Sequence, residues 1–134
     1  MQSTYEKTIS VVGLGYVGLV TAAGFGLKGY RVLGIDVDEN KIDCVNAKTS
    51  PLYEEGLKEA IEKIDILATS DFKAAADAEV IFICVCTPSN GDGSMNTAHL
   101  KNATERLSDV IKHDKNHHLV VVRSTVAPGT TIYK

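Results

Sequence analysis

The glycine-rich turn near the amino terminus constrains the fold more than any other part of this sequence. It consists of Gly13, Leu14, Gly15, Tyr16, Val17 and Gly18 and fits the pattern GxGxxG. The pattern alone is weak, but here it follows an apolar run at Thr8–Val12 and precedes a stretch rich in helix formers. In a strand–turn–helix unit, Gly13 permits the tight turn, Gly15 lets a pyrophosphate approach the backbone, and Gly18 lets the helix pack closely on the strand. We therefore expect a dinucleotide at the N-terminus of this helix; the alternative is a glycine-rich turn without a ligand.

An acidic residue, Asp36, ends the next apolar run, close to the usual spacing of about 20 residues beyond the glycine turn. A carboxylate there accepts hydrogen bonds from the adenosine ribose hydroxyls and repels a 2′-phosphate. Asp38 follows two positions later and no arginine stands beside Asp36, which favours NAD over NADP. Lys41 is a nearby cation that argues in the other direction. The alternative reading of Asp36 is a solvated loop carboxylate.

Apolar, β-rich runs alternate with stretches of helical periodicity along the whole chain. The runs lie at Thr8–Val12, Arg31–Ile35, Ile66–Thr69, Val80–Val85 and Leu119–Val122. Helices are expected over residues 17–28 with Gly29 as C-cap, over 39–46, 57–64 and 71–76, and over 100–111 with Asn96 or Thr97 as N-cap.

This alternation, with strands that are apolar throughout, predicts an α/β fold: a Rossmann-like, doubly wound parallel sheet with helices on both faces. A sheet in the order 3-2-1-4-5-6 would still need its sixth strand, and the last residues look like a loop and the beginning of another helix. We therefore expect residues 1–134 to be one NAD-binding domain, truncated before its last strand.

Polar residues follow the fourth and fifth apolar runs. The fourth run ends in Val85, Cys86, Thr87, Pro88 and Ser89, and the fifth is followed by Ser124 and Thr125. Parallel α/β sheets bind ligands outside the carboxyl ends of their strands, so these residues should share an edge with the glycine turn. Small hydroxyl residues there suit contact with a nicotinamide ribose or a substrate; ordinary strand-ending turn chemistry is the alternative.

The composition excludes several classes of protein. The chain has 134 residues, 44% hydrophobic and 23% charged, with a net charge of −3, which suits one soluble globular domain. It has no basic run for nucleic acid, no basic helix for a membrane surface, and no apolar stretch long enough to span a bilayer. The amino terminus lacks the arrangement of a signal peptide, so we expect a cytoplasmic protein.

The cysteines and histidines give little indication of chemistry. The three cysteines fit neither a disulfide framework nor a metal site, and Cys84 and Cys86 are interpreted as buried small hydrophobes on one face of a strand. The four histidines, His99, His113, His117 and His118, are interpreted as surface residues.

Five segments occur in the same order as motifs of a known family. They are VVGLGYVGL, GIDVDENKI, SPLYEEGL, VIFICVCTPSNGDGS and VVVRSTVAPGTT. On these segments the chain resembles the amino-terminal, NAD-binding domain of the UDP-glucose/GDP-mannose dehydrogenases, over nearly its whole length. The glycine motif is shared by many dehydrogenases, whereas the other segments are much more specific together.

The resemblance implies roles for individual residues. Residues 13–18 match the pyrophosphate turn, and Asp36 and Lys41 match positions that hold the adenosine ribose. Residues 85–89 match the loop beside the cofactor. Ser124 and Thr125 match the loop near the nicotinamide, and the threonine is implicated in the chemistry by orienting water or substrate.

Two positions depart from the family pattern. Glu55 stands where the family often has proline, and Cys86 stands where proline, glycine or asparagine usually precedes the Thr-Pro pair. Neither departure removes a ligand side chain, but Cys86 leaves the shape of its loop open.

The resemblance also implies a two-step oxidation in which the primary alcohol of a nucleotide sugar becomes a carboxylate and two NAD molecules are reduced. UDP-glucose is the first candidate substrate, followed by GDP-mannose and then an N-acetyl-hexosamine. The catalytic cysteine, a lysine and further acidic groups would lie in a linker and nucleotide-sugar domain outside this chain, and the full-length protein would be a homodimer. The chain alone is expected to bind NAD and to oxidise no sugar.

Two alternatives stay open. The first is the NAD domain of a 6-phosphogluconate or hydroxyacyl-CoA type of dehydrogenase, against which the SPLYEEGL segment argues. The second is a stand-alone NAD-binding module.

Overall fold

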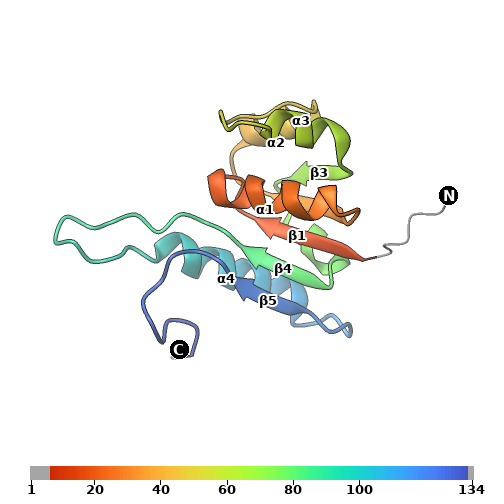
Figure 1. Ribbon diagram of the computed structural model, residues 1–134. Coiled ribbons are helices and arrows are strands. Elements are labelled where there is room, and N and C mark those ends of the chain that lie inside the picture. The colour runs from red at the N-terminus through yellow and green to blue at the C-terminus, as the bar shows by residue number, and fades with distance from the viewer. Residues whose placement is uncertain (1–6, 133–134) are drawn as a thin grey trace.

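A parallel, five-stranded β-sheet forms the centre of the computed structural model, which describes residues 7–132. In chain order the strands are β1 (Thr8–Val12), β2 (Arg31–Ile35), β3 (Ile66–Thr69), β4 (Val80–Ile83) and β5 (Leu119–Val122). Their spatial order is β3-β2-β1-β4-β5 (Figure 1). The chain starts in the middle, runs to one side and then to the other, so the carboxyl ends of β1 and β4 flank the switch point where ligands bind in such sheets.

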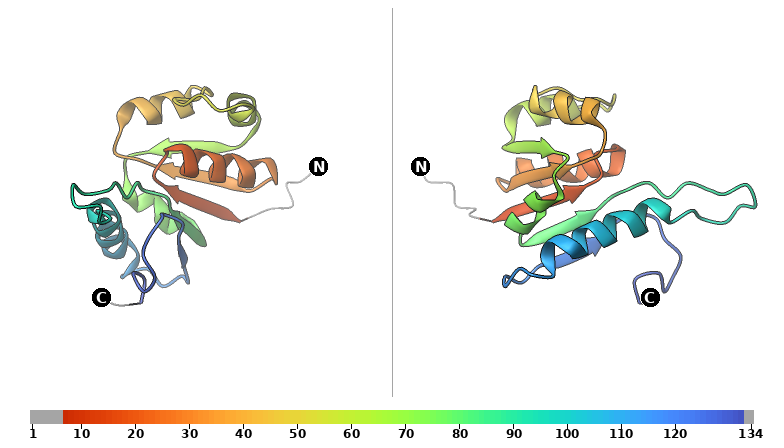
Figure 2. Two further views of the ribbon diagram at one scale, coloured as in Figure 1. Left: turned by 60° about the vertical axis from the view of Figure 1, so that its left-hand side comes forward. Right: turned by 180° about the vertical axis from the view of Figure 1, so that it is seen from behind.

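Helices cover both faces of the sheet (Figure 2), which confirms the predicted doubly wound architecture. One face carries α1 (Tyr16–Leu27), α2 (Glu39–Asn46) and α3 (Leu57–Lys63), and the other carries the 3₁₀-helix η1 (Phe72–Asp77) and α4 (Ala98–Ile111). Neighbouring side chains of a buried strand point to opposite faces, so each layer has its own apolar core. Val11 of β1 packs in the α1 core, whereas Val12 packs in the α4 core.

Helix α1 ends at Leu27 with Lys28 as its C-cap, so the predicted Gly29 follows the cap rather than forming it. Gly29 has φ +97°, and its N–H donates to the Gly26 carbonyl at 2.9 Å, while the Tyr30 N–H donates to the Phe25 carbonyl at 3.2 Å. This pair of bonds satisfies carbonyls of the last helical turn and reverses the chain. The Phe25 and Tyr30 rings meet edge to face over the turn, with centroids 5.9 Å apart. As a result β2 starts at once and runs parallel to β1.

The element boundaries agree with those expected from the sequence to within two residues. Strand β4 ends at Ile83, two residues earlier than predicted, and beyond it the chain is held by the Ser124 hydroxyl, which donates to the Val85 carbonyl at 2.7 Å. Thr97 occupies the N-cap of α4, but the bond to the Ala98 N–H, at 2.9 Å, is accepted by the side chain of Asn96. Residues 128–132 form turns, so the helix expected there is not formed within the described residues.

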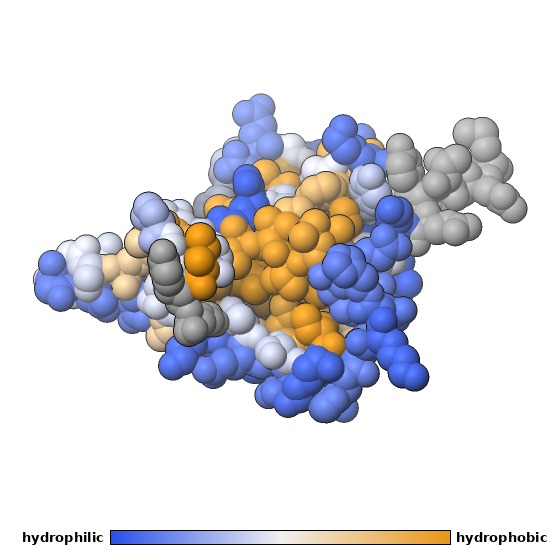
Figure 3. All heavy atoms as spheres, turned by 90° about the horizontal axis from the view of Figure 1, so that it is seen from below, coloured by the Kyte–Doolittle hydropathy of each residue, from blue (hydrophilic) through white to orange (hydrophobic). Residues whose placement is uncertain are grey.

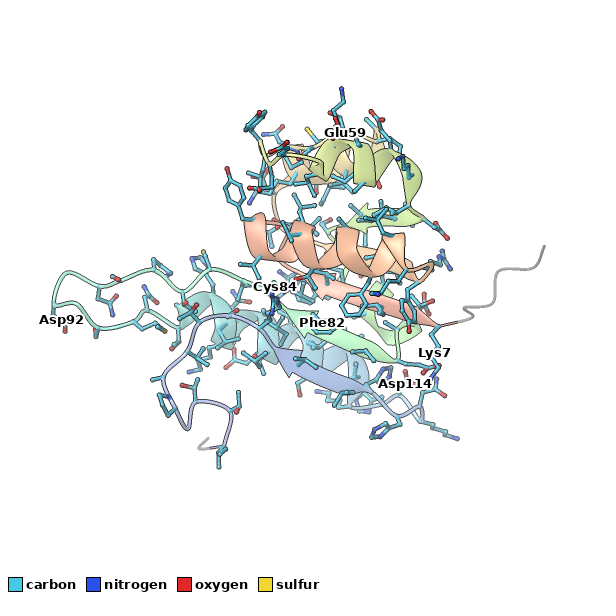
Figure 4. The ribbon with its side chains drawn as sticks, viewed as in Figure 1. Lys7, Glu59, Phe82, Cys84, Asp92 and Asp114 are labelled. Atoms are coloured by element: carbon cyan, nitrogen blue, oxygen red, sulfur yellow. The ribbon has the colours of Figure 1, made fainter. Side chains whose placement is uncertain are left out.

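The connection between β4 and α4 projects from the body as a long loop (Figure 1) with Asp92 at its tip (Figure 4). One carboxylate oxygen of Asp92 accepts from both the N–H and the hydroxyl of Ser94, and these bonds hold the pKa of Asp92 below its ordinary value of 3.8. At the lower side of the sheet, β5 leaves Leu119 and Val120 54% and 37% exposed, and Figure 3 shows an apolar area on this side. Within residues 7–132 no helix is long and apolar enough to cross a membrane.

Candidate cofactor-binding site

The glycine turn joins β1 to α1, and two of its glycines are required by the packing of the turn itself. Gly13 has φ +98°, and a Cβ there would lie 2.9 Å from the backbone of Cys84 in the neighbouring chain segment. A Cβ at Gly18 would lie 1.7 Å from the Gly13 carbonyl oxygen. The first turn of α1 therefore sits directly on the loop that precedes it, and its N-terminus opens at the switch point.

Gly15 has a different function in the turn. Its φ of −79° is open to any residue, and a Cβ there would have nothing within 4 Å. Gly15 is the N-cap of α1 and supplies no side-chain cap, so the N–H groups of the first helical turn lack the usual intrahelical and side-chain acceptors. Space above the backbone, free donors and the positive end of the helix dipole together suit an anion.

The carboxylate of Asp36 is fixed beside this turn. Its Oδ2 accepts from the Leu14 N–H at 2.7 Å and its Oδ1 accepts from the Asp38 N–H at 2.8 Å. Each oxygen keeps a second acceptor site, so both can still receive a hydroxyl proton. Asp38 in turn caps α2 by accepting from the Asn40 N–H at 2.9 Å. These bonds fix the orientation of the Asp36 carboxylate as a hydrogen-bond acceptor.

A cleft of about 560 Å³ runs along the carboxyl edge of the sheet, within the usual size of a small-molecule site. It brings together most of the residues that the sequence singled out: Gly13, Gly15, Tyr16, Val17, Asp36, Lys41, Val85, Cys86, Thr87, Ser124 and Thr125. Four of the predicted cofactor residues do not line it. Leu14 and Gly18 are buried below the turn, and Pro88 and Ser89 lie at the base of the projecting loop.

The ends of β4 and β5 are bound to each other by the hydroxyl groups that the sequence placed there. The Thr87 hydroxyl donates to the Thr125 carbonyl at 2.7 Å, and the Ser124 hydroxyl donates to Val85. Both oxygens keep lone pairs for a ligand. The exposed Thr125 side chain lies at this edge in the cleft, with its carbonyl held by Thr87. These two loops therefore form one hydrogen-bonded wall of the cleft.

The two cysteines near this wall differ in environment, which corrects the interpretation of both as buried. Cys84 is 7% exposed, and burial raises the pKa of its thiol above the ordinary 9.0, an effect that the Arg123 guanidinium only partly opposes. A protonated, buried thiol is unreactive. Cys86 lies beyond the end of β4, exposed, in the wall of the cleft. The Arg123 side chain reaches α1, where its Nε donates to the Thr21 hydroxyl at 3.1 Å.

Sequence reasoning missed one part of the lining of the cleft. It is formed by His99, Asn102 and Arg106 on one side of α4, together with Phe72 at the start of η1. The spacing of three and four residues along α4 was a possible signal, because such positions share a helical face. Nothing in the sequence, however, shows that α4 faces the cleft, since that depends on how the helix crosses β4.

One histidine is not at the surface, contrary to the sequence interpretation. The side chain of His118 is only 5% exposed, and its two ring nitrogens lie 2.7 Å from the Ala78 carbonyl and 2.8 Å from the Asp114 carboxylate. It joins the start of β5 to the segment before β4, at the amino edge of the sheet and away from the cleft. Its contacts are structural.

These features fit a dinucleotide cofactor. The uncapped helix N-terminus suits a pyrophosphate, the oriented carboxylate at the end of β2 suits a ribose diol, and the cleft continues on to the hydroxyl-bearing ends of β4 and β5. When bound, NAD would supply a hydride acceptor at the β4–β5 side, and the chain itself would bind and orient it.

Comparison with known proteins identifies the family. The profile of the UDP-glucose/GDP-mannose dehydrogenase family, NAD binding domain, matches residues 7–133. GDP-mannose 6-dehydrogenase of Pseudomonas aeruginosa is 40% identical over 127 residues, which is 91% of this chain and 29% of that protein. UDP-glucose 6-dehydrogenase of Haloferax volcanii is 35% identical over 127 residues, 92% of this chain and 30% of that protein. The chain thus spans about three tenths of the length of these relatives.

Comparison with solved structures gives the same family. GDP-mannose dehydrogenase from Pseudomonas aeruginosa superposes with a TM-score of 0.90 at 40% identity, over 92% of this chain and 29% of that one. UDP-glucose dehydrogenase from Pyrobaculum islandicum superposes with a TM-score of 0.89 at 36% identity, over 97% of this chain and 31% of that one. A lactate dehydrogenase at 16% identity and a TM-score of 0.64 shares the fold alone. The chain belongs to the UDP-glucose/GDP-mannose dehydrogenase family, as an NAD-binding domain.

Proposed function

We propose that this chain is the cofactor-binding part of an NAD-dependent dehydrogenase that oxidises the primary alcohol of a nucleotide sugar to a carboxylate, with UDP-glucose as substrate and two NAD reduced per sugar. The observation that carries the proposal is the open, uncapped N-terminus of α1 beside the fixed Asp36 carboxylate, in a chain of this family. The whole protein would act as a cytoplasmic homodimer, on the sequence grounds given above, with a second domain that binds the sugar.

Each part of the cofactor would be bound by residues from a different strand end. The pyrophosphate would rest on residues 13–18, and the adenosine ribose would be bound by Asp36 and Lys41. Residues 85–89 and Ser124 would lie beside the nicotinamide half. Thr125, exposed at the same edge, would orient water or the reacting alcohol.

The proposal that this chain binds NAD while a second domain supplies the catalytic groups is supported by the side chains available within residues 7–132. The two-step oxidation needs a base for the alcohol proton and a nucleophile that holds the aldehyde for the second hydride transfer. Among the described residues that line the cleft, Cys86 is the exposed thiol, and its neighbours Val85 and Thr87 supply no charge to activate it. The chain alone should therefore bind NAD without turnover.

GDP-mannose is a second candidate substrate, because the GDP-mannose 6-dehydrogenase of Pseudomonas aeruginosa is 40% identical to this chain. The test supplies the full-length protein with NAD and one sugar at a time and follows the absorbance of the reduced cofactor. We expect two reduced NAD for each UDP-glucose. Faster turnover of GDP-mannose would make GDP-mannose, and not UDP-glucose, the substrate. Turnover by the isolated chain would refute the proposal that the catalytic groups lie in a second domain.

A further inference from the structure

Three polar side chains of α4, His99, Asn102 and Arg106, line the same cleft as the residues at the end of β2, and one of them lies over an aromatic ring. The Arg106 guanidinium carbon lies 4.1 Å from the centroid of the Phe72 ring. Phe72 is itself buried at the start of η1, so its ring is a rigid support. Such a contact covers one face of the guanidinium and leaves the other face available for a flat ligand group.

An exposed apolar side chain that takes no part in the core lines the same cleft. Val37 follows Ile35 and Asp36 at the end of β2; it is 71% exposed and lines the cleft. An exposed apolar side chain in a pocket that also contains a stacked arginine is typical of a site for a flat, uncharged ring system.

We propose that Arg106, supported by Phe72, is the residue that selects and holds the adenine base of the cofactor, with Val37 on the other side of the base. The inference rests on the proposed NAD site and adds a residue to it that lies 70 positions from Asp36 in sequence. Asn102, one helical turn before Arg106 on the same face of α4, has an amide that can accept from and donate to the edge of a base.

The topology of the sheet places the base rather than the nicotinamide here. Asp36 and Val37 follow β2, and Phe72 follows β3, which is β2's outer neighbour. The helix α1 N-terminus lies between this side and the ends of β4 and β5. A dinucleotide with its pyrophosphate on α1 and its ribose on Asp36 therefore has its adenine toward Phe72.

The alternative function of the guanidinium is to act as a charge on the pyrophosphate, and the test separates this function from contact with the base. Calorimetry with the purified chain compares NAD, ADP-ribose and ribose 5-diphosphate, which keeps the pyrophosphate and lacks the base. For Arg106→Leu we expect NAD and ADP-ribose to bind about three- to tenfold more weakly and ribose 5-diphosphate to bind as before. Lys101→Leu, which removes the same charge from an exposed position of α4 outside the cleft, is the matched control.

Arg106→Lys keeps the positive charge but removes the planar guanidinium. It should bind NAD as weakly as Arg106→Leu, because an ammonium group cannot stack on a base. Near wild-type NAD binding by Arg106→Lys, or an equal loss for ribose 5-diphosphate in Arg106→Leu, would assign Arg106 to the phosphates and overturn the proposal. Unchanged NAD binding by Arg106→Leu would overturn it as well. Failure of the wild-type chain to bind either NAD or ADP-ribose would instead refute the cofactor site itself.

Discussion

A single methyl group at Gly15 should separate cofactor binding from folding. The backbone of Gly15, with φ −79° and ψ −164°, is accessible to alanine, and the added Cβ would meet nothing within 4 Å. The cost to stability is then limited to a poorer N-cap, under about 1 kcal/mol, and is partly offset by the less flexible unfolded chain. The methyl group would, however, occupy the space through which a pyrophosphate approaches the N–H groups of α1.

The loss of affinity can be worked from those bonds. A charge-assisted hydrogen bond contributes about 1.5–3 kcal/mol, and displacement of the pyrophosphate should remove at least one of them. We therefore expect Gly15→Ala to bind NAD about 10- to 100-fold more weakly. Calorimetric titration gives this affinity, and urea unfolding gives the free energy of unfolding of the same sample.

Two other glycines of α1 provide the controls. Gly24 is exposed, and a Cβ there also meets nothing within 4 Å, so Gly24→Ala should raise the free energy of unfolding by about 0.5–1 kcal/mol without any change in NAD affinity. Gly18→Ala should unfold the turn, because its Cβ would lie 1.7 Å from the Gly13 oxygen. If Gly15→Ala binds NAD within twofold of wild type, the pyrophosphate does not rest on this helix.

Further predictions concern four other residues. The chain should bind NAD more tightly than NADP, and Asp36→Ala should narrow the difference in parallel titrations; equal affinities in the wild type would remove the function given to this carboxylate. In the full-length enzyme Thr125→Ala should lower kcat and kcat/KM together, by more than it weakens NAD binding, and a normal kcat would make Thr125 a loop former only. The hydroxyl of Ser10 is fully buried in β1 without a hydrogen-bond partner in the described structure, so Ser10→Ala should raise the free energy of unfolding, measured in urea, by about 1 kcal/mol. A lower free energy of unfolding in this variant would show that the hydroxyl makes a stabilising hydrogen bond. The pKa of Asp114 is held below its ordinary 3.8, mainly by the N–H of Asn116, so the carboxylate contributes fully to stability well above pH 3.8 and loses this contribution as the pH falls through the lowered pKa. Asp114→Asn should therefore make the free energy of unfolding depend less on pH in the acid range. An unchanged dependence on pH in that range would contradict the prediction.

The sequence predicts the structure best where a feature depends only on residues that are close together in the chain. The glycine at position 29 ends α1 because its positive φ suits few other residues, and this can be predicted from a helical stretch followed by glycine. Asp36 could be placed at the end of β2 by spacing from the glycine turn. The bonds that orient its carboxylate could not, because the Leu14 N–H reaches it only when β1 and β2 lie side by side.

Disagreements arise where a residue's environment depends on distant segments. Cys84 and Cys86 are two apart in one apolar run, yet one is buried and the other exposed, because Ser124 holds the chain beyond Ile83 on a course outside the strand. His118 has the sequence context of a polar loop, but it is enclosed by the Ala78 carbonyl, 40 residues away.

The sequence by itself determined the strand–turn–helix that opens the chain, the alternation that requires a parallel sheet, and the family. Those properties follow from periodicity, glycine conformation and short motifs, which act over a few residues. Only the tertiary structure decided which side of α4 lines the cleft and that Arg106 lies over the Phe72 ring in the same cleft as Asp36. A crossing angle between a helix and a sheet is the outcome of packing among many side chains at once, and no local pattern in the chain encodes it.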